Sequence, residues 1–240
     1  MLSWIDLPGK SPLARVGDVS LLLNGTYSGE DLLLGFNPRS CHKLQDLLPD
    51  TLCPVPGVVE EVSGLIDGLS ATSLRNFAAS ALLAPEVHLK FWTCPASNGY
   101  HHAYPGGLAE HSLEVADSIA SATRLPQFWR ELGVVYGLLH DYGKPWCLDQ
   151  ALRNPTDFRK HGERGLYYLQ PALAALRSED PLLGALMEEV LGGRRCPRDN
   201  PYPLAIRAIV KGFDQMSCEL TRELVVTERA PHLDDMLIQF

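Results

Sequence analysis

A histidine and an aspartate stand side by side, His140-Asp141, where a long apolar run ends. The run from Pro126 to Leu139 has apolar residues at helical spacing, and adjacent side chains at a helix end can turn toward one point. An imidazole and a carboxylate that meet there make half of a divalent-metal site. The pair therefore favours a fold in which other helices bring further ligands to the end of this one.

Candidates for the other half of the site lie in two more helical segments. His111 falls in a helix expected over residues 108–123, and a short connection would place this helix antiparallel to the next. Asp214 follows Val210 and Phe213 in a helix expected over residues 203–225, so a carboxylate interrupts an apolar stretch. A buried carboxylate needs a partner, and a metal ion would be one.

From residue 58 onward the sequence mostly shows patterns typical of helices, and it has neither an internal repeat nor a low-complexity tract. We expect a mainly α fold, a helical bundle over residues 61–240. Apolar residues at helical spacing, together with helix-ending prolines, predict helices over residues 70–83, 108–123, 126–139, 161–178, 181–191 and 203–225.

Residues 1–60 form a different N-terminal segment that contains β structure. Two short strands, over residues 16–24 and 31–36, are expected on either side of a glycine-rich turn. A short helix is expected over residues 40–48 with Ser40 as its N-cap. The break at Pro54-Val-Pro-Gly57 ends a segment that is too short to be treated as an independent domain.

Composition limits the class of protein. A hydrophobic content of 45% and a charged content of 21% are ordinary for a globular chain, and the net charge of −8 argues against non-specific binding of nucleic acid by the whole surface. No secretory signal and no apolar window of membrane-spanning length are visible. Six scattered cysteines without a C-x-x-C pair favour reduced thiols in the cytoplasm over a zinc-thiolate site.

A longer motif precedes the first of these histidines. The motif reads His101-His102-Ala-Tyr-Pro-Gly-Gly-Leu-Ala-Glu-His111 and ends at that histidine. Together with the H…HD…D order of His111, His140-Asp141 and Asp214, it resembles the HD-domain metal-dependent phosphohydrolases. Residues 94–116 are most similar to two branches of that superfamily, the HD-type 3′→5′ exoribonucleases and the HD-type relaxases of conjugative elements. The resemblance covers roughly residues 70–220.

This resemblance implies an HD-domain helical bundle and a divalent metal held by His111, His140, Asp141 and Asp214. The metal would be Mn, Fe, Ni, Co or Zn, with Mg also compatible, and a water activated by it would attack a phosphoester. Asp141 would also orient that water, and Lys144 would face the substrate phosphate or, alternatively, complement a helix dipole. His161 matches a position where many relatives carry a histidine for a second metal or for phosphate.

Two features leave the exact activity open. The exoribonuclease branch usually carries a His-His-Gly motif before its last aspartate, but Glu189–Arg198 contains no histidine, so a site with one metal or an altered activity gains weight. The exoribonucleases also carry an N-terminal OB-fold, for which residues 1–60 are short and poor in aromatic residues.

Further residues are candidates for phosphate binding. His101 and His102 would line the pocket as second-metal or phosphate contacts, or else form a solvated pair on a loop. A group of basic residues would form an electropositive mouth for a nucleic acid or nucleotide substrate, or else solvated helix faces: Arg159, Lys160, Arg164, Arg194, Arg195, Arg198, Arg207 and Lys211. The sequence thus predicts a metal-dependent phosphodiesterase resembling a nuclease; the alternatives are a nucleotide phosphomonoesterase and a non-catalytic binding module.

Overall fold

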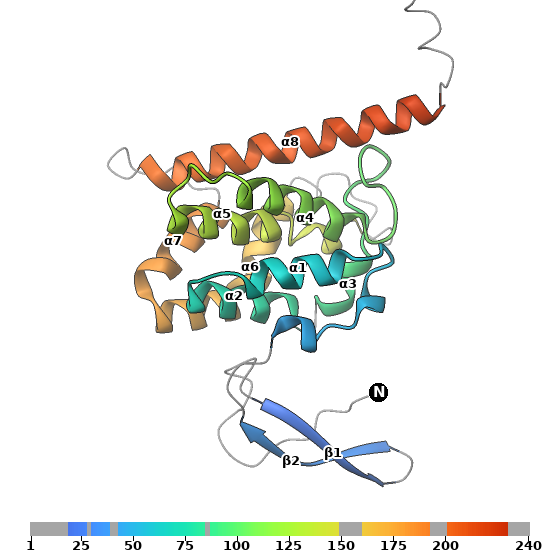
Figure 1. The fold of residues 1–240 in the computed structure, drawn as a ribbon, viewed down its shortest axis with the longest axis vertical. Helices are drawn as coiled ribbons and strands as arrows, with labels where there is room; N and C mark the ends of the chain where they lie inside the picture. Colours follow the sequence, from blue (N-terminus) through green and yellow to red (C-terminus); the bar gives the residue numbers. More distant parts are fainter. Residues whose placement is uncertain are drawn as a thin grey trace, which may run out of the picture.

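The computed structural model describes residues 19–27, 30–38, 43–84, 87–148, 160–192 and 201–229. Within these ranges the protein is mainly helical, as the sequence predicts (Figure 1). The chain passes through a β-hairpin, β1 (Val19–Tyr27) and β2 (Glu30–Pro38), and two 3-10 turns, η2 (Leu44–Asp46) and η3 (Asp50–Leu52). It then forms α1 (Val58–Asp67), α2 (Thr72–Leu82), α3 (His88–Thr93), α4 (Gly107–Ala120), α5 (Gln127–Leu139), η4 (Lys144–Trp146), α6 (His161–Glu179), α7 (Pro181–Leu191) and α8 (Pro201–Arg229).

The pair α4 and α5 lies at the centre of the bundle. Their connection is short, and Gly137 in α5 allows the two helices to approach closely, because a Cβ there would lie 3.0 Å from Cδ1 of Ile119 and 3.3 Å from Cα of Ala116. The long helix α8 packs across both helices, and α6 and α7 close another side of the bundle (Figure 1). No helix in the described ranges is long and apolar enough to cross a membrane.

The six helices expected from apolar spacing are all present, with ends shifted by a few residues. Pro126 was expected in the first turn of a helix, but it occupies the N-cap position of α5 with extended backbone (φ −54°, ψ 139°). The short helix α3 was not anticipated, because its six residues are too few to show an apolar period.

The N-terminal segment agrees only in part with expectation. The two strands form an antiparallel hairpin in which Tyr27 pairs with Glu30. The helix expected over residues 40–48 is wrong: the described part of that stretch contains only the 3-10 turn η2, with Lys43 at its N-cap position, and Ser40 lies outside the described residues. The carboxylate of Asp67 accepts the Leu44 N–H at 3.0 Å, so a distant side chain fixes this backbone instead of a regular helix.

Residues 43–57 pack on the helical body. Leu44, Leu48, Leu52 and Cys53 are buried and belong to the same hydrophobic cluster as the apolar faces of α1, α2 and α4. The hydrophobic cluster of the bundle therefore already includes residue 44, about fifteen residues before the predicted boundary between residues 60 and 61.

Candidate metal centre

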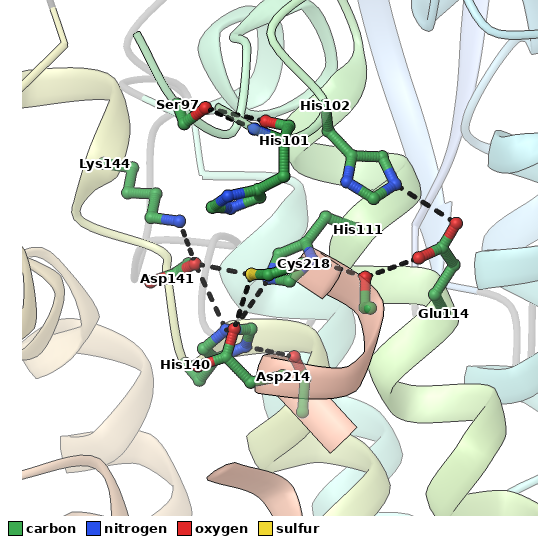
Figure 2. Close-up of polar contacts among 12 residues, drawn as sticks. Ser97, His101, His102, His111, Glu114, His140, Asp141, Lys144, Asp214 and Cys218 are labelled. Carbon is green, nitrogen blue, oxygen red and sulfur yellow. Dashed lines mark hydrogen bonds and ion pairs between the residues drawn. The ribbon is translucent and has the colours of Figure 1, made fainter. Parts of the chain in front are cut away.

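Four side chains from three helical elements converge at one point in the bundle (Figure 2). His111 comes from α4, His140 is the C-cap of α5 with Asp141 directly after it, and Asp214 comes from α8. Nε2 of His111 lies 3.1 Å from Oδ1 of Asp214, and Nε2 of His140 lies 3.1 Å from Oδ2 of Asp141. One ligand atom from each of the four residues lies within 4.8 Å of all the others.

The orientation of the two imidazoles is set by the helices that carry them. His140 donates from Nδ1 to the Gly137 carbonyl oxygen at 2.7 Å, a bond within the last turn of α5. Nδ1 of His111 lies 2.9 Å from the Ser217 hydroxyl of α8. Because Nδ1 of each ring is used in this way, Nε2 of each ring faces the carboxylates.

These residues fit a divalent cation. Nε2 of His111 and Nε2 of His140 are both buried, and each lies 3.1 Å from one of the two carboxylates and 3.6 Å from the other. Buried carboxylates need a positive partner, and a metal ion bound by the two nitrogens and the two carboxylates would supply it. Two imidazoles with two carboxylates form a ligand set that suits Mn, Fe, Co, Ni and Zn.

The electrostatics of the cluster favour a positive charge at its centre. Burial opposes ionisation of Asp141, but the charges of His140 and Lys144 hold the pKa of its carboxyl well below the usual range. The His111 and His140 imidazoles likewise outweigh burial and hold the pKa of Asp214 far below its ordinary value. The two carboxylates in turn raise the pKa of His140 to about 10 against the effect of burial. A divalent cation would take the place of that proton.

Lys144 lies beside the carboxylates. It begins η4, its side chain is buried, and its ammonium forms an ion pair with Oδ2 of Asp141 (Figure 2). The turn from His140 to Lys144 is held by backbone bonds, among them the Lys144 N–H to the Asp141 carbonyl at 2.9 Å. The structure therefore puts the cation of Lys144 at the cluster rather than at a solvated helix end.

The three further histidines predicted as site residues, His101, His102 and His161, occupy different places around the cluster. Nε2 of His161, at the start of α6, lies 3.3 Å from Oδ1 of Asp141. The His101 ring lies 5.3 Å from the His111 ring, its Nε2 is buried without a hydrogen-bond partner among the described residues, and burial lowers the pKa of His101 to about 4. The His102 ring lies 5.4 Å from the His111 ring, and its Nε2 lies 3.1 Å from Oε1 of Glu114.

The basic residues predicted to form an electropositive mouth lie in different places, and only some of them line the pocket at the cluster. Arg207 and Lys211 line a pocket of about 450 Å³ whose wall also contains His140, Asp141 and Asp214. Arg164 donates to the Trp146 carbonyl at 3.2 Å, and Lys160 is exposed beside the first turn of α6. Four of the predicted residues lie outside the described ranges: Arg159, Arg194, Arg195 and Arg198.

Sequence reasoning missed two polar residues that contact the site's histidines. Glu114 stands three residues after His111, and Ser217 stands three residues after Asp214, so each lies on the same helix face as a candidate ligand. Burial opposes ionisation of Glu114, but hydrogen bonds from His102 and Ser217 hold the pKa of its carboxyl below the usual value. The i+3 spacing was the available signal, but it is shared by many surface residues.

Comparison with known proteins supports one family. A family model described as the HD domain matches residues 108–199, a range that includes His111, His140 and Asp141 and ends before Asp214. No curated protein and no solved structure matches the chain. The match supports the HD metal-dependent phosphohydrolase superfamily, and the structure adds Asp214 to the cluster through α8.

Proposed function

We propose that the protein is a metal-dependent phosphohydrolase that cleaves a phosphoester, most simply a phosphodiester, in a nucleic acid or a nucleotide. The observation that carries this proposal is the cluster of His111, His140, Asp141 and Asp214, of which the last three line an open pocket. The pocket volume of about 450 Å³ falls within the range of small-molecule sites, roughly 300–1,000 Å³.

Each charged residue has a role in such a reaction. A divalent cation, when bound by the four residues, supplies Lewis-acid polarisation of a phosphoryl oxygen and lowers the pKa of a water. Asp141 has one oxygen near His140 and the other near His161, and it would both hold the cation and orient the attacking water. Lys144, buried against Asp141, would offset negative charge that develops on the phosphoryl group.

The substrate class is inferred from the cations in the pocket. Arg207, Lys211 and Asp214 stand about one helical turn apart along α8, and all three line the pocket. In a chain with a net charge of −8, two cations next to the ligand cluster favour an anionic substrate with charge beyond the scissile group. Nucleotides and oligonucleotides have such charge, and the resemblance of residues 94–116 to nuclease and relaxase branches favours the same class.

The test is a hydrolysis assay with Mn²⁺ on protein purified without chelator. The panel contains a bis-phosphodiester, a phosphomonoester, short RNA and DNA oligomers and deoxynucleoside triphosphates. We expect wild type to hydrolyse at least one diester or nucleotide and Asp141→Ala to lose that activity. Lys211→Ala should raise KM for the preferred nucleotide substrate, whereas Lys43→Ala, an exposed lysine that does not line the pocket, should not. Full hydrolysis by Asp141→Ala would refute the proposal.

A second candidate is a binding or regulatory module that keeps the HD scaffold without catalysis. The feature that favours it is the lack of histidine in Glu189–Arg198, where exoribonuclease relatives have a His-His-Gly motif. The four-ligand set argues against it. Stoichiometric metal binding without hydrolysis of any substrate in the panel would favour this module over the enzyme.

A further inference from the structure

A chain of hydrogen bonds runs from the back of His111 to the loop before α4. Nδ1 of His111 lies 2.9 Å from the Ser217 hydroxyl, and that hydroxyl lies 2.5 Å from Oε2 of Glu114. The other oxygen of Glu114, Oε1, lies 3.1 Å from Nε2 of His102 (Figure 2). The chain thus links α4, α8 and the loop that carries His101 and His102.

The direction of each bond follows from the groups present. An ionised carboxylate can only accept hydrogen bonds, so the Ser217 hydroxyl donates its single proton to Glu114. The Ser217 oxygen is then left as an acceptor, and Nδ1 of His111 must donate to it. A neutral imidazole with its proton on Nδ1 has a lone pair on Nε2, the atom that faces Asp141 and Asp214.

We propose that Glu114 and Ser217 are positioning residues of the metal centre: they fix the tautomer and direction of His111, so that Nε2 is preorganised as a ligand. This inference rests on the proposed function, since it assumes that His111 binds a metal. Partners that orient ligating histidines in this way typically change metal affinity 10- to 100-fold when they are removed.

The same carboxylate also holds the adjacent loop. His102 has a positive φ of 42°, an uncommon conformation for a residue other than glycine, and its buried side chain contacts Glu114 and, at 3.3 Å, the Thr221 hydroxyl. The His102 carbonyl accepts the Ala96 N–H at 3.0 Å, which closes the loop. Glu114 therefore connects the loop that presents His101 to the bond that orients His111.

A neighbouring serine provides a matched control. Ser112 is buried beside His111 on α4, but its hydroxyl has no hydrogen-bond partner in the described part of the chain. Ser112→Ala and Ser217→Ala therefore remove the same atom at two buried positions, and only the second removes the bond to His111. A general effect of serine removal on packing would appear in both variants.

The experiment measures metal affinity and histidine tautomer separately. The dissociation constant for Mn²⁺ is measured by equilibrium dialysis, and the tautomer of His111 is read from ¹⁵N chemical shifts of the metal-free protein. We expect Ser217→Ala to bind Mn²⁺ about 10- to 100-fold more weakly and to lose the single Nδ1–H tautomer. Ser112→Ala should match wild type in both readouts, and Ser217→Thr, which keeps a hydroxyl, should restore the affinity.

Two outcomes would overturn the inference. One is a Ser217→Ala variant that keeps wild-type affinity and a wild-type His111 tautomer; the other is an equal loss of affinity in Ser112→Ala. If wild type itself binds no Mn²⁺, the proposed function fails, and the tautomer measurement still decides whether Ser217 orients His111. The two failures are therefore distinguishable.

Discussion

Replacing Gly143 with alanine tests whether the backbone of the turn after His140-Asp141 packs directly against the backbone of α6. The backbone of Gly143 has a negative φ of −84°, which any residue can adopt, so backbone conformation does not explain the glycine. A Cβ at this position would lie 2.5 Å from the Gly165 nitrogen and 2.9 Å from the His161 carbonyl carbon, and it would overlap the His161 carbonyl oxygen. All of these are backbone atoms of α6, which cannot rotate out of the way.

The size of the effect follows from these distances. Ordinary van der Waals contact begins near 3.4 Å, so the turn and α6 must separate by at least about 1 Å. Overpacking of this kind typically costs about 1–3 kcal/mol, and we expect the upper part of that range because the clash is with backbone. For a chain of this size, each kcal/mol lowers Tm by roughly 2–4 °C, so Gly143→Ala should lower it by roughly 4–12 °C.

Urea and thermal unfolding followed by circular dichroism measure this change, with Gly162→Ala as the control. Gly162 is in the first turn of the same helix, and a Cβ there would meet nothing within 4 Å. An alanine in a helix should leave the protein as stable as wild type or stabilise it by about 0.5–1 kcal/mol. A Gly143→Ala variant as stable as Gly162→Ala would refute the close approach of this turn to α6.

Two further predictions concern buried polar contacts. The Tyr142 hydroxyl donates to the Ala81 carbonyl at 2.6 Å, and the residue four positions after Ala81 is Pro85, which has no N–H to donate to that carbonyl instead. Tyr142→Phe should therefore lower the free energy of unfolding, measured in urea, by about 1–3 kcal/mol, and an unchanged stability would contradict this. Burial opposes ionisation of Glu131, but hydrogen bonds from Ser70 and from the backbone before α2 hold the pKa of its carboxyl below the ordinary value. The stability advantage of wild type over Glu131→Gln should therefore be full at pH 7 and shrink below about pH 4.3, near the pKa of an unfolded glutamate; an advantage that grows in acid would contradict the sign.

The positions of the long helices could be predicted because their buried apolar residues recur at helical spacing. Leu113, Val115, Ala116 and Ile119 indicate the buried face of α4, and the structure buries all four. Asp214 was singled out because it interrupts an apolar stretch, and the structure brings it to the other three residues, though its side chain remains 34% exposed in the pocket wall.

Other parts depend on contacts between distant residues, which spacing along one sequence does not encode. The backbone at residue 44 is fixed by Asp67, twenty-three positions later, instead of forming the expected helix. Glu114 and Ser217 are about a hundred positions apart, and neither has a local pattern that distinguishes it from a surface residue. Arg164 is predicted to bind substrate from its charge, and the hydrogen bond from its guanidinium to the Trp146 carbonyl, eighteen positions earlier, has no signal in the sequence.

The most direct test of the metal centre is the metal content of wild type and of the double variant His140→Ala/Asp141→Ala. Both proteins are purified without chelator, dialysed against Mn²⁺ and measured by elemental analysis, with circular dichroism to check that the double variant remains folded. We expect about one divalent ion per wild-type chain, as four ligands from one cluster imply, and none bound stoichiometrically by the variant. A wild-type chain without metal, or a folded double variant that binds as much as wild type, would contradict the assignment of this cluster as a metal centre.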